Sequence, residues 1–329
     1  MYSLDMFSPD LCIRRHEWTS TELRALSPYR RILGTNGEDE VLQALDHAVK
    51  VRVSGQLGPL LILFSGGLDS TLLACLAHRH LDTSLSIDLC NVCFSDGASA
   101  DRQASRLAAE ELRHVSPGRL FRLIEVNATL ADVDADGSRL ARLLKPASTL
   151  MDRNIGAALH LAAQGRGLVN GQLYHSPSRV VLLGTGADEQ AGGYGRHRTA
   201  FRNGGVDGLV AELEADVNRL WLRNLGRDDR LVSDVSREAR FPFLDERVVH
   251  ALATVPMDGL ADLTQPVGIG DKLVLRNIAR TLGLHHTAAR AKRAIQFGSG
   301  LARASNVQIF GSGNQANKRH AGTFVVADS

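Results

Sequence analysis

The sequence predicts an α/β fold in which a parallel sheet carries helices on both faces and a C-terminal layer of helices is added. Two observations predict it. Over the first half of the chain, short apolar runs alternate with segments of helical spacing, a pattern typical of a covered parallel sheet. From about residue 205 the strand-like runs stop and only helical spacing continues. We therefore expect the second half to contribute helices alone.

The first elements can be justified one by one. The segment 38–53 has apolar residues at helical spacing and follows Asn36-Gly37, which favours a helix start. The segment 59–64 (PLLILF) is apolar without alternation, which suits a strand buried on both faces. The later expected strands are 86–94, 120–126 and 180–183, and the expected helices between them are 70–80, 100–114, 139–144 and 155–163.

The second half is predicted to be helical at 206–222, 246–253 and 272–282. In the first of these segments one stripe holds Leu209, Val210, Leu213, Val217, Leu220 and Trp221. Residues 1–35 contain Pro9, Pro28 and Gly34 and are predicted as an extended lead-in. The main domain is expected over 36–303. The tail, 304–329, is polar and without period, so disorder is predicted there.

The composition is that of an ordinary globular protein. The chain has 329 residues, of which 44% are hydrophobic and 22% charged, and its formal net charge is +2. This near balance gives no reason to expect nucleic acid or an anionic membrane as a partner. No run approaches the roughly 20 apolar residues that cross a bilayer, and the N-terminus lacks a secretory pattern. We expect a protein of the cytoplasm, a reducing compartment.

Cys90 and Cys93 form a CxxC pair, which can indicate zinc or redox chemistry. They lie in the expected strand 86–94, where residues three apart point to opposite faces. No second Cys/His pair with ligand spacing lies nearby in the sequence. Two buried thiols are the favoured interpretation.

The segment Ser65-Gly66-Gly67-Leu68-Asp69-Ser70 lies where the first strand becomes a helix. Two consecutive glycines let a ligand approach the backbone closely, and the helix N-terminus adds partial positive charge. The serines at either end supply hydroxyl donors. The loop is neither a Walker A sequence nor GxGxxG. It predicts a cradle for phosphate oxygens of a different type, in which Asp69 acts through Mg²⁺.

A second glycine-rich turn, GTGADEQAGGY at 184–194, follows the expected strand 180–183. In an open parallel sheet, ligands bind outside the carboxyl ends of the strands. Two such turns, each with an aspartate, can converge on one metal–phosphate group. The sequence thus predicts a magnesium site formed by Asp69 and Asp188.

These motifs resemble a known family. SGGLDS at 65–70, GTGADEQ with GGY at 184–194 and REARFPFLD at 237–245 come in the order of the synthetase domain of asparagine synthetase. The segments 195–198, 224–230 and 292–299 also resemble that family, and the resemblance covers about residues 35–303. That domain belongs to the PP-loop ATP pyrophosphatases, which are adenine nucleotide alpha hydrolase-like. The resemblance implies that the predicted parallel sheet is of this type.

The resemblance also implies an activity, a ligase reaction of asparagine biosynthesis. ATP and Mg²⁺ would activate aspartate as β-aspartyl-AMP with release of pyrophosphate, and ammonia would displace AMP to give asparagine. The resemblance implies that Ser65, Gly66, Gly67 and Ser70 bind the pyrophosphate and that Phe64 and Gly184 border the adenosine. It implies magnesium binding by Asp69 and Asp188. The implied catalytic residues are Asp188 and Lys272, which matches a lysine that stabilises developing charge.

Two departures from the family pattern bear on this activity. Glutamine-using members carry a nucleophilic cysteine directly after the initiator methionine, whereas Tyr2 follows Met1 here. We therefore expect free ammonia, a separate glutaminase or a longer form of the chain to supply nitrogen. Thr185 replaces a glutamate implicated in proton transfer, and Glu189 matches a family position with another role. Loss of a general base typically lowers a rate about 10²–10⁴-fold.

Three hypotheses stay open. The chain is an ATP-dependent asparagine synthetase-like enzyme without its own glutaminase, a nucleotide-binding or interaction protein that keeps the fold without turnover, or a PP-loop enzyme with another acceptor such as a tRNA base. The last predicts a basic groove, which a net charge of +2 does not favour.

Other charged and apolar segments have structural interpretations. The basic run 195–198 can bind phosphate or pair with Asp228 and Asp229, and both alternatives stay open. A charge network behind the site is expected from Arg237, Glu238, Arg240 and Asp245. We expect 241–244 (FPFL) in the core and His285-His286 at a surface helix end.

Overall fold

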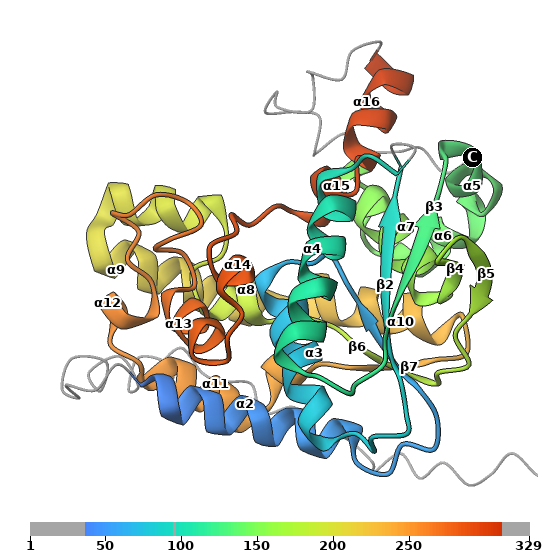
Figure 1. Ribbon diagram of the computed structural model, residues 1–329. Coiled ribbons are helices and arrows are strands. Elements are labelled where there is room, and N and C mark those ends of the chain that lie inside the picture. The colour runs from blue at the N-terminus through green and yellow to red at the C-terminus, as the bar shows by residue number, and fades with distance from the viewer. Residues whose placement is uncertain (1–36, 95–96, 311–329) are drawn as a thin grey trace, which may run out of the picture.

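A computed structural model of the protein describes residues 37–94 and 97–310 (Figure 1). The lead-in predicted for residues 1–35 lies outside this part of the chain. A seven-stranded sheet has the order β5-β4-β3-β2-β1-β6-β7. Its strands are β1 (Leu60–Leu63), β2 (Ile87–Cys93), β3 (Phe121–Asn127), β4 (Arg166–Val169), β5 (Gln172–His175), β6 (Val180–Leu182) and β7 (Glu238–Arg240).

The centre of the sheet is parallel, as predicted. Strand β1 pairs in parallel with β2 on one side and with β6 on the other, with Leu61 opposite both Asp88 and Val181. Strand β3 continues the parallel pairing beside β2, and β7 does so beside β6. The carboxyl ends of β1 and β6, which lead into the two glycine turns, therefore lie next to each other at one edge.

The helices cover both faces of the sheet (Figure 1). Those before β6 are α2 (Glu38–Val53), α3 (Leu68–His80), α4 (Ala100–Val115), α5 (Leu130–Ala135), α6 (Gly137–Leu144) and α7 (Leu150–Ala163). Those after it are α8 (Ala187–Gln190), α9 (Gly195–Leu220), α10 (Gly226–Ser233), α11 (Glu246–Thr254), α12 (Met257–Leu260), α13 (Leu273–Thr281), α14 (His285–Ala288), α15 (Ile295–Gly298) and α16 (Leu301–Phe310). A π-helical turn spans Trp221–Leu225 and a 3₁₀ turn Pro242–Leu244.

Strand β1 separates two hydrophobic clusters. Leu60 and Ile62 belong to one, which also contains buried residues of α2, α3, α11 and α13. Leu61 belongs to the other, with residues of α7 and α10. Burial on both faces explains why this run is apolar without alternation. The burial also confirms the prediction of a strand buried on both faces at 59–64.

Most predicted elements are confirmed with small shifts of their ends. The helix predicted over 38–53 has those bounds, and Gly37 precedes it with a φ of 65°, a left-handed conformation that glycine adopts readily. The 3₁₀ turn at Pro242–Leu244 buries Phe243, as expected for that apolar segment. His285 and His286 are exposed at the start of α14, also as expected.

The prediction of a purely parallel sheet is wrong at one edge. Strands β3, β4 and β5 pair antiparallel. β4 and β5 form a hairpin whose turn is Asn170-Gly171, with φ values of 50° and 81°. An Asn-Gly pair is a strong hairpin signal. The hairpin was missed because its strands are short and lie partly in solvent rather than forming an apolar run.

The second half also departs from the prediction of helices alone. Strand β7 pairs in parallel with β6, so the strands do not stop at residue 205. Its three residues, Glu-Ala-Arg, give no hydrophobic signal because it is an edge strand. Helices α11 to α14 gather on one side (Figure 1), whereas α10, α15 and α16 pack against α7. The C-terminal helices therefore divide between two places rather than forming one layer.

Two further corrections concern helix ends. On the predicted stripe, Leu209, Leu213 and Leu220 are buried, but Trp221 is 54% exposed because the chain widens into the π-helical turn there. Helix α16 continues to Phe310, so predicted disorder is wrong for residues 304–310. Ser305 is buried and donates a hydrogen bond to Asn154 Oδ1 (2.9 Å) on α7, which explains the order. Residues 311–329 are not described.

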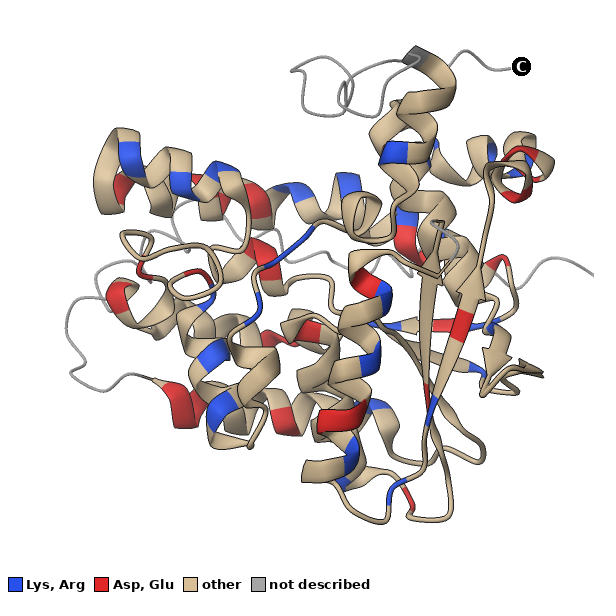
Figure 2. Cartoon of the chain, turned by 45° about the horizontal axis from the view of Figure 1, so that its top comes forward, with Lys and Arg blue, Asp and Glu red and all other residues tan. Residues whose placement is uncertain are grey.

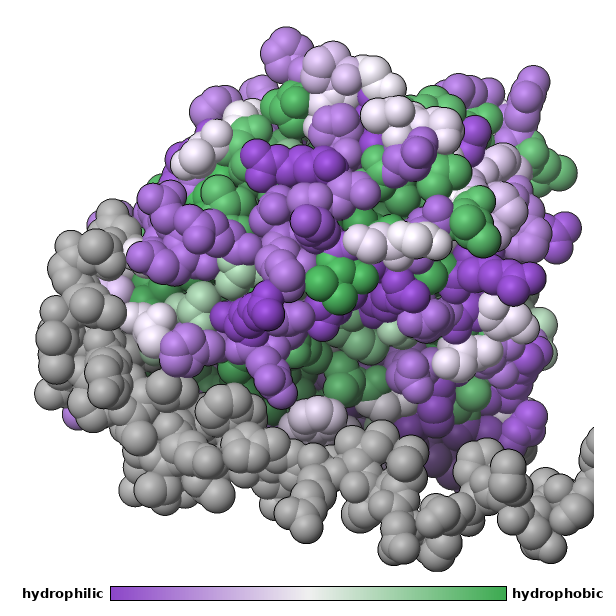
Figure 3. Space-filling model, turned by 90° about the horizontal axis from the view of Figure 1, so that it is seen from below, coloured by the Kyte–Doolittle hydropathy of each residue, from purple (hydrophilic) through white to green (hydrophobic). Residues whose placement is uncertain are grey.

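The surface and the cysteines agree with the composition. Acidic and basic residues are interspersed over the visible elements in Figure 2. Viewed from below, apolar patches are broken up by polar ones wherever described residues are visible (Figure 3). Cys90 and Cys93 are buried, as expected, and burial raises the pKa of Cys90 to about 12. Within the described ranges, no helix has the length and apolar character to span a membrane.

Candidate functional site

The first glycine turn joins β1 to α3. Gly66 has a φ of +71°, and a Cβ there would lie 2.4 Å from backbone atoms of Ala104 and Ser105, so only glycine fits. Gly67 donates its N–H to Ser65 Oγ (3.2 Å). No described side chain caps α3 at Gly67. The N–H groups of the first helical turn have no intrahelical acceptors, so they remain available to an anionic ligand.

The second glycine turn joins β6 to α8, and its polar groups are bonded within the protein. Thr185 Oγ1 donates to Asp228 Oδ2 (2.9 Å), and Gly186 N–H donates to Glu189 Oε2 (3.1 Å). Glu189 Oε1 accepts from the Tyr194 hydroxyl (2.6 Å) and from Asn224 Nδ2 (2.7 Å). Burial, reinforced by Asp188, raises the pKa of Glu189. Glu189 thus braces this turn.

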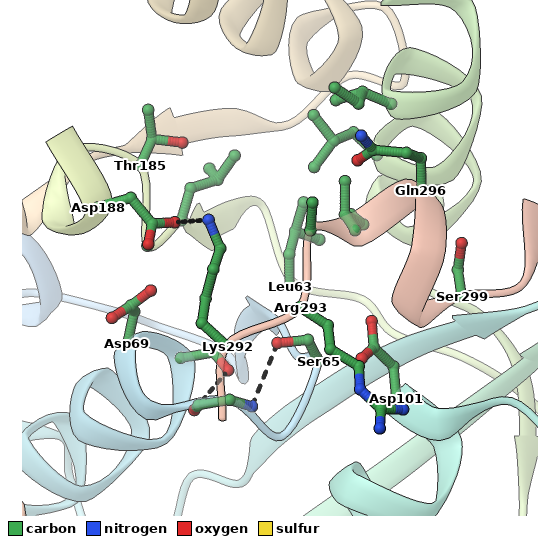
Figure 4. Close-up of a pocket in the computed structure, with 18 of the residues that line it drawn as sticks. Leu63, Ser65, Asp69, Asp101, Thr185, Asp188, Lys292, Arg293, Gln296 and Ser299 are labelled. Carbon is green, nitrogen blue, oxygen red and sulfur yellow. Dashed lines mark hydrogen bonds and ion pairs between the residues drawn. The ribbon is translucent and has the colours of Figure 1, made fainter. Parts of the chain in front are cut away.

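Asp69 and Asp188 come together at Lys272. The Lys272 Nζ atom lies 2.6 Å from Asp69 Oδ2 and 2.7 Å from Asp188 Oδ1. The two aspartates extend from different elements toward one space in Figure 4. Lys272 is 1% exposed and precedes α13 with a φ of 52°. Its N–H donates to the Ala191 carbonyl (3.0 Å), which ties it to the second turn.

The charges in this group influence one another. The pKa of Asp188 lies well below its ordinary value. Burial alone would raise it, but the ammonium groups of Lys272 and Lys292 outweigh that effect. Burial, opposed by Lys272, raises the pKa of Asp69. Burial lowers the pKa of Lys272, but the two carboxylates outweigh it and raise that pKa overall. Asp188 is therefore ionised and Lys272 is charged.

A coil between α14 and α15 crosses both turns (Figure 1), and it is largely basic (Figure 2). Lys292 Nζ lies 2.7 Å from Asp188 Oδ2 and 3.9 Å from the centre of the Tyr194 ring. Arg290 Nη1 donates to the Gly66 carbonyl (3.1 Å). The sequence reasoning gave Lys292 no role. A role for Lys292 could have been inferred from its position in the segment 292–299, which resembles the family.

A cavity of about 670 Å³ opens between these elements. All but one of the predicted site residues line it: Phe64, Ser65, Gly67, Asp69, Ser70, Gly184, Asp188 and Lys272. Gly66 does not line the cavity, because the side of its Cα where a side chain would stand lies against the backbone of α4. Besides the charged groups around Lys272, the walls include apolar residues of β1, β2 and α7, among them Leu63, Val92, Ile155 and Leu159.

The carboxylates fit a magnesium ion shared with a ligand. Mg²⁺ is usually held by one or two carboxylates together with substrate phosphates and water. Asp69 and Asp188 supply two carboxylates at one point beside the uncapped start of α3. Over residues 37–94 and 97–310, no group of three or more His, Cys, Asp or Glu side chains could hold a metal. The two aspartates would therefore supply only part of the ion's ligands, and phosphate oxygens and water would supply the rest.

The basic run 195–198 pairs with neither predicted partner. The segment α9 is broken at Gly205, whose φ of 59° and ψ of −147° are not helical, and Asp216 beyond this break contacts Arg196 and His197 before it, at 2.5 Å and 2.7 Å. Arg198 Nη1 donates to the backbone carbonyls of Leu263 and Gln265. Of the two open alternatives, pairing with Asp228 and Asp229 is not found, because the break at Gly205 brings Asp216 beside Arg196 and His197. Arg196 also lines the cavity.

The predicted charge network behind the site is present in part. Arg240 Nε donates to Glu238 Oε1 (2.8 Å), and Asp245 pairs with Arg52 at 2.8 Å. Arg237 instead donates to backbone carbonyls, including that of Gln164 (2.9 Å). Its role is to hold chain segments rather than to pair with acids.

The fold and cleft define a class of α/β proteins in which two glycine turns bring aspartates to one edge of a mostly parallel sheet. Within that class, the chain belongs to the asparagine synthase family, whose model matches residues 40–222 and 202–307.

Curated relatives agree with this assignment. The chain is 38% identical to a chicken (Gallus gallus) protein named asparagine synthetase domain-containing protein 1, over 80% of this chain and 52% of the relative. The human protein of that name is 37% identical, over 82% and 48%. A Methanocaldococcus jannaschii protein named putative asparagine synthetase [glutamine-hydrolyzing] 1 is 28% identical, over 78% and 49%. The chain thus spans about half the length of these relatives.

Proposed function

We propose that this chain is an ATP-dependent carbon–nitrogen ligase of asparagine synthetase type, built on a PP-loop ATP pyrophosphatase sheet. Aspartate and ATP would give β-aspartyl-AMP and pyrophosphate, and ammonia would convert the adenylate to asparagine and AMP. One observation carries the proposal. Asp69 and Asp188, from two different glycine turns, meet at the buried Lys272 beside the uncapped start of α3.

The first turn is suited to the phosphates. The free N–H groups at the start of α3, together with the hydroxyl groups of Ser65 and Ser70, would bind pyrophosphate oxygens. Gly66 and Gly67 shape that turn, and Phe64 and Gly184 at the strand ends would border the adenosine. Asp69 and Asp188 would hold Mg²⁺, which when bound neutralises phosphate charge.

Two lysines are suited to stabilise charge that develops on the α-phosphate. Attack by the aspartate carboxylate on phosphorus forms an oxygen–phosphorus bond and expels pyrophosphate. Negative charge accumulates on the phosphorus oxygens as this happens. Lys272 and Lys292 already face the carboxylates that define this position. Ammonium groups fixed in a buried site stabilise such charge without reorganising.

Amide formation needs an acceptor for one proton of the attacking ammonia, and Thr185 is unsuited to that task at neutral pH. Of the carboxylates beside the second turn, Asp69 and Asp188 are paired with lysine, and Glu189 accepts three hydrogen bonds. Asp228 lines the cavity and contacts Thr185, which stands at the position of the family glutamate: its Oδ2 accepts from the Thr185 hydroxyl (2.9 Å), and its Oδ1 is paired with Arg227 at 2.8 Å. A carboxylate oxygen has a second lone pair. We assign the proton acceptor role to Asp228.

The first experiment measures binding of ATP in the presence of Mg²⁺ by calorimetry. The unmodified protein should bind, and Asp69→Ala and Asp188→Ala should each weaken binding at least about tenfold, or 1.4 kcal/mol. Asp229→Ala is the matched control, because this exposed aspartate follows Asp228 in the chain. Absence of binding by the unmodified protein would remove the proposal.

The second experiment separates the two chemical steps. Aspartate-dependent exchange of pyrophosphate into ATP reports adenylation, and asparagine formation from ammonia reports the complete reaction. Asp228→Asn should leave the exchange intact and lower asparagine formation about 10²–10⁴-fold. Asp229→Asn should change neither. Equal loss of both signals in Asp228→Asn would show that this residue supports adenylation or folding instead.

The second candidate function is nucleotide binding without turnover. It is favoured by Thr185, whose hydroxyl is committed to Asp228 rather than to a reacting group. The same assays decide between the two, since tight ATP binding without AMP or pyrophosphate release would support nucleotide binding without turnover.

The nitrogen source belongs to the proposal as well. Free ammonia should support the reaction by this chain, and glutamine should do so when a glutaminase is present, either as a separate protein or in a longer form of the chain.

A further inference from the structure

One side chain of the cavity, Gln296, has a buried oxygen without a hydrogen-bond partner among the described residues. Gln296 on α15 is 6% exposed, lines the cavity, and its Oε1 atom is buried without a hydrogen bond from any described residue. Figure 4 shows its carboxamide on the side of the pocket away from Asp69 and Asp188. Buried polar groups in proteins are almost always hydrogen-bonded. An unpaired amide that faces a cavity therefore points to a ligand that pairs with it.

The amide is held in a fixed position. Helix α15 packs against α7 and α4. The Ser299 carbonyl, directly after the helix, accepts the Phe94 N–H (2.9 Å) at the end of β2. Gly298 lies so close to the Asp101 carboxylate that a Cβ there would be 2.1 Å from Oδ1. These contacts fix the helix between two other elements, so Gln296 is already oriented before a ligand arrives.

The surroundings of Gln296 are apolar. Helix α7, against which α15 packs, contributes Ile155 and Leu159 to the cavity wall, and the central strands contribute Leu63 and Val92. The groups suited to phosphate lie instead at the first turn. A ligand that extends from Asp69 to Gln296 would thus have an anionic end and a flat or apolar end with hydrogen-bonding edges, as a nucleotide does.

Resting on the proposed function, we propose that the Gln296 carboxamide binds the amino edge of the adenine base and is the side chain that makes the site specific for adenine. A carboxamide presents a donor and an acceptor side by side, whichever way its oxygen and nitrogen are placed. Adenine presents the complementary pair, the 6-amino donor beside a ring-nitrogen acceptor, and Gln or Asn pairs with it through two hydrogen bonds.

The test compares two ligands that differ only in the 6-amino group. Binding of ATP and of purine riboside 5′-triphosphate, which lacks that group, is measured by calorimetry with Mg²⁺ for the unmodified protein and for Gln296→Met. The unmodified protein should bind ATP at least about tenfold more tightly than the analogue. In Gln296→Met the ratio should fall to about one, because the thioether can neither donate to a ring nitrogen nor accept well from the amino group.

The outcomes separate this inference from the proposed function. If the unmodified protein binds no ATP, both fall. If it binds ATP but the ratio is one, or if Gln296→Met keeps the ratio, the specificity role is wrong and the proposed function stands. Gln296→Leu is measured alongside, so that one unfolded variant does not decide the result. Gln103→Met, at an exposed residue that also lines the cavity, is the control and should keep the ratio.

Discussion

The two glycine turns look alike in sequence and differ in what they do with their polar groups. In the turn at Ser65–Ser70, no side chain caps the helix, and the residues of its first turn line the cavity. In the turn at Gly184–Tyr194, Thr185, Gly186 and Glu189 are all bonded within the protein. The first turn leaves the N–H groups at the start of α3 without a side-chain acceptor, so they can receive a ligand. The second turn, whose Thr185, Gly186 and Glu189 are bonded within the protein, holds one side chain, Asp188, in place.

The largest expected effect comes from filling the first turn. Gly66→Ala should lower the free energy of unfolding by roughly 3–5 kcal/mol, because the new Cβ meets backbone that cannot move aside and φ is +71°. Chemical denaturation measures the loss. Gly118→Ala is the control, with a φ of +86° and open space around it, and should lose only about 1 kcal/mol. Equal losses would mean that the close approach to α4 does not matter.

The next effect concerns pH, where carboxyl groups near the two turns should behave in opposite ways. Burial raises the pKa of Asp101, on the helix that covers the first turn, to about 7. The folded state then holds its proton more tightly than the unfolded state. This stabilisation is present at low pH and is lost as pH rises from about 4 to about 7. The lowered pKa of Asp188 acts in reverse, since its contribution is lost in acid.

Asp101→Asn isolates the first of these contributions. Between pH 5 and 8 the unmodified protein should lose about 2–3 kcal/mol of stability through Asp101, and the variant should not. Denaturation curves at both pH values supply the comparison. Asp39→Asn, at an exposed position on α2, should follow the unmodified protein. An identical pH response of Asp101→Asn and the unmodified protein would show that this carboxyl is ionised throughout the range.

The smallest effect should come from the second turn. Glu189→Gln replaces one acceptor oxygen by a donor, so at least one of the three donors that face this side chain loses its acceptor. We expect about 2 kcal/mol less stability, together with weaker Mg²⁺-ATP binding because Asp188 is less firmly placed. Glu238→Gln, on an exposed edge strand, should change neither quantity measurably. If Glu189→Gln also leaves both unchanged, Glu189 does not brace the turn.

The central strands, Asp69 and Asp188 could be predicted from the sequence because they depend on local signals, whereas Lys272 was expected only from the family resemblance. An apolar run specifies β1, and a glycine turn at a strand end specifies where Asp69 must lie. The roles proposed for Asp228, Lys292 and Gln296 depend on contacts between distant segments, although Lys292 and Gln296 lie in the motif at 292–299. Lys292 reaches Asp188 only because a coil without periodicity crosses the sheet edge. The strand β7 was missed for a related reason, since its partner β6 rather than its own residues makes it a strand.

Lys272 has a further consequence for the cleft. Two carboxylates held this close repel each other, and the ammonium group between them offsets that repulsion at short range. The protein therefore carries its own counter-ion, covalently tethered to the start of α13. Under the proposed function, a divalent cation would exchange with this tethered charge instead of adding to the site, and the released ammonium group could then pair with the negative charge that arrives with the ligand.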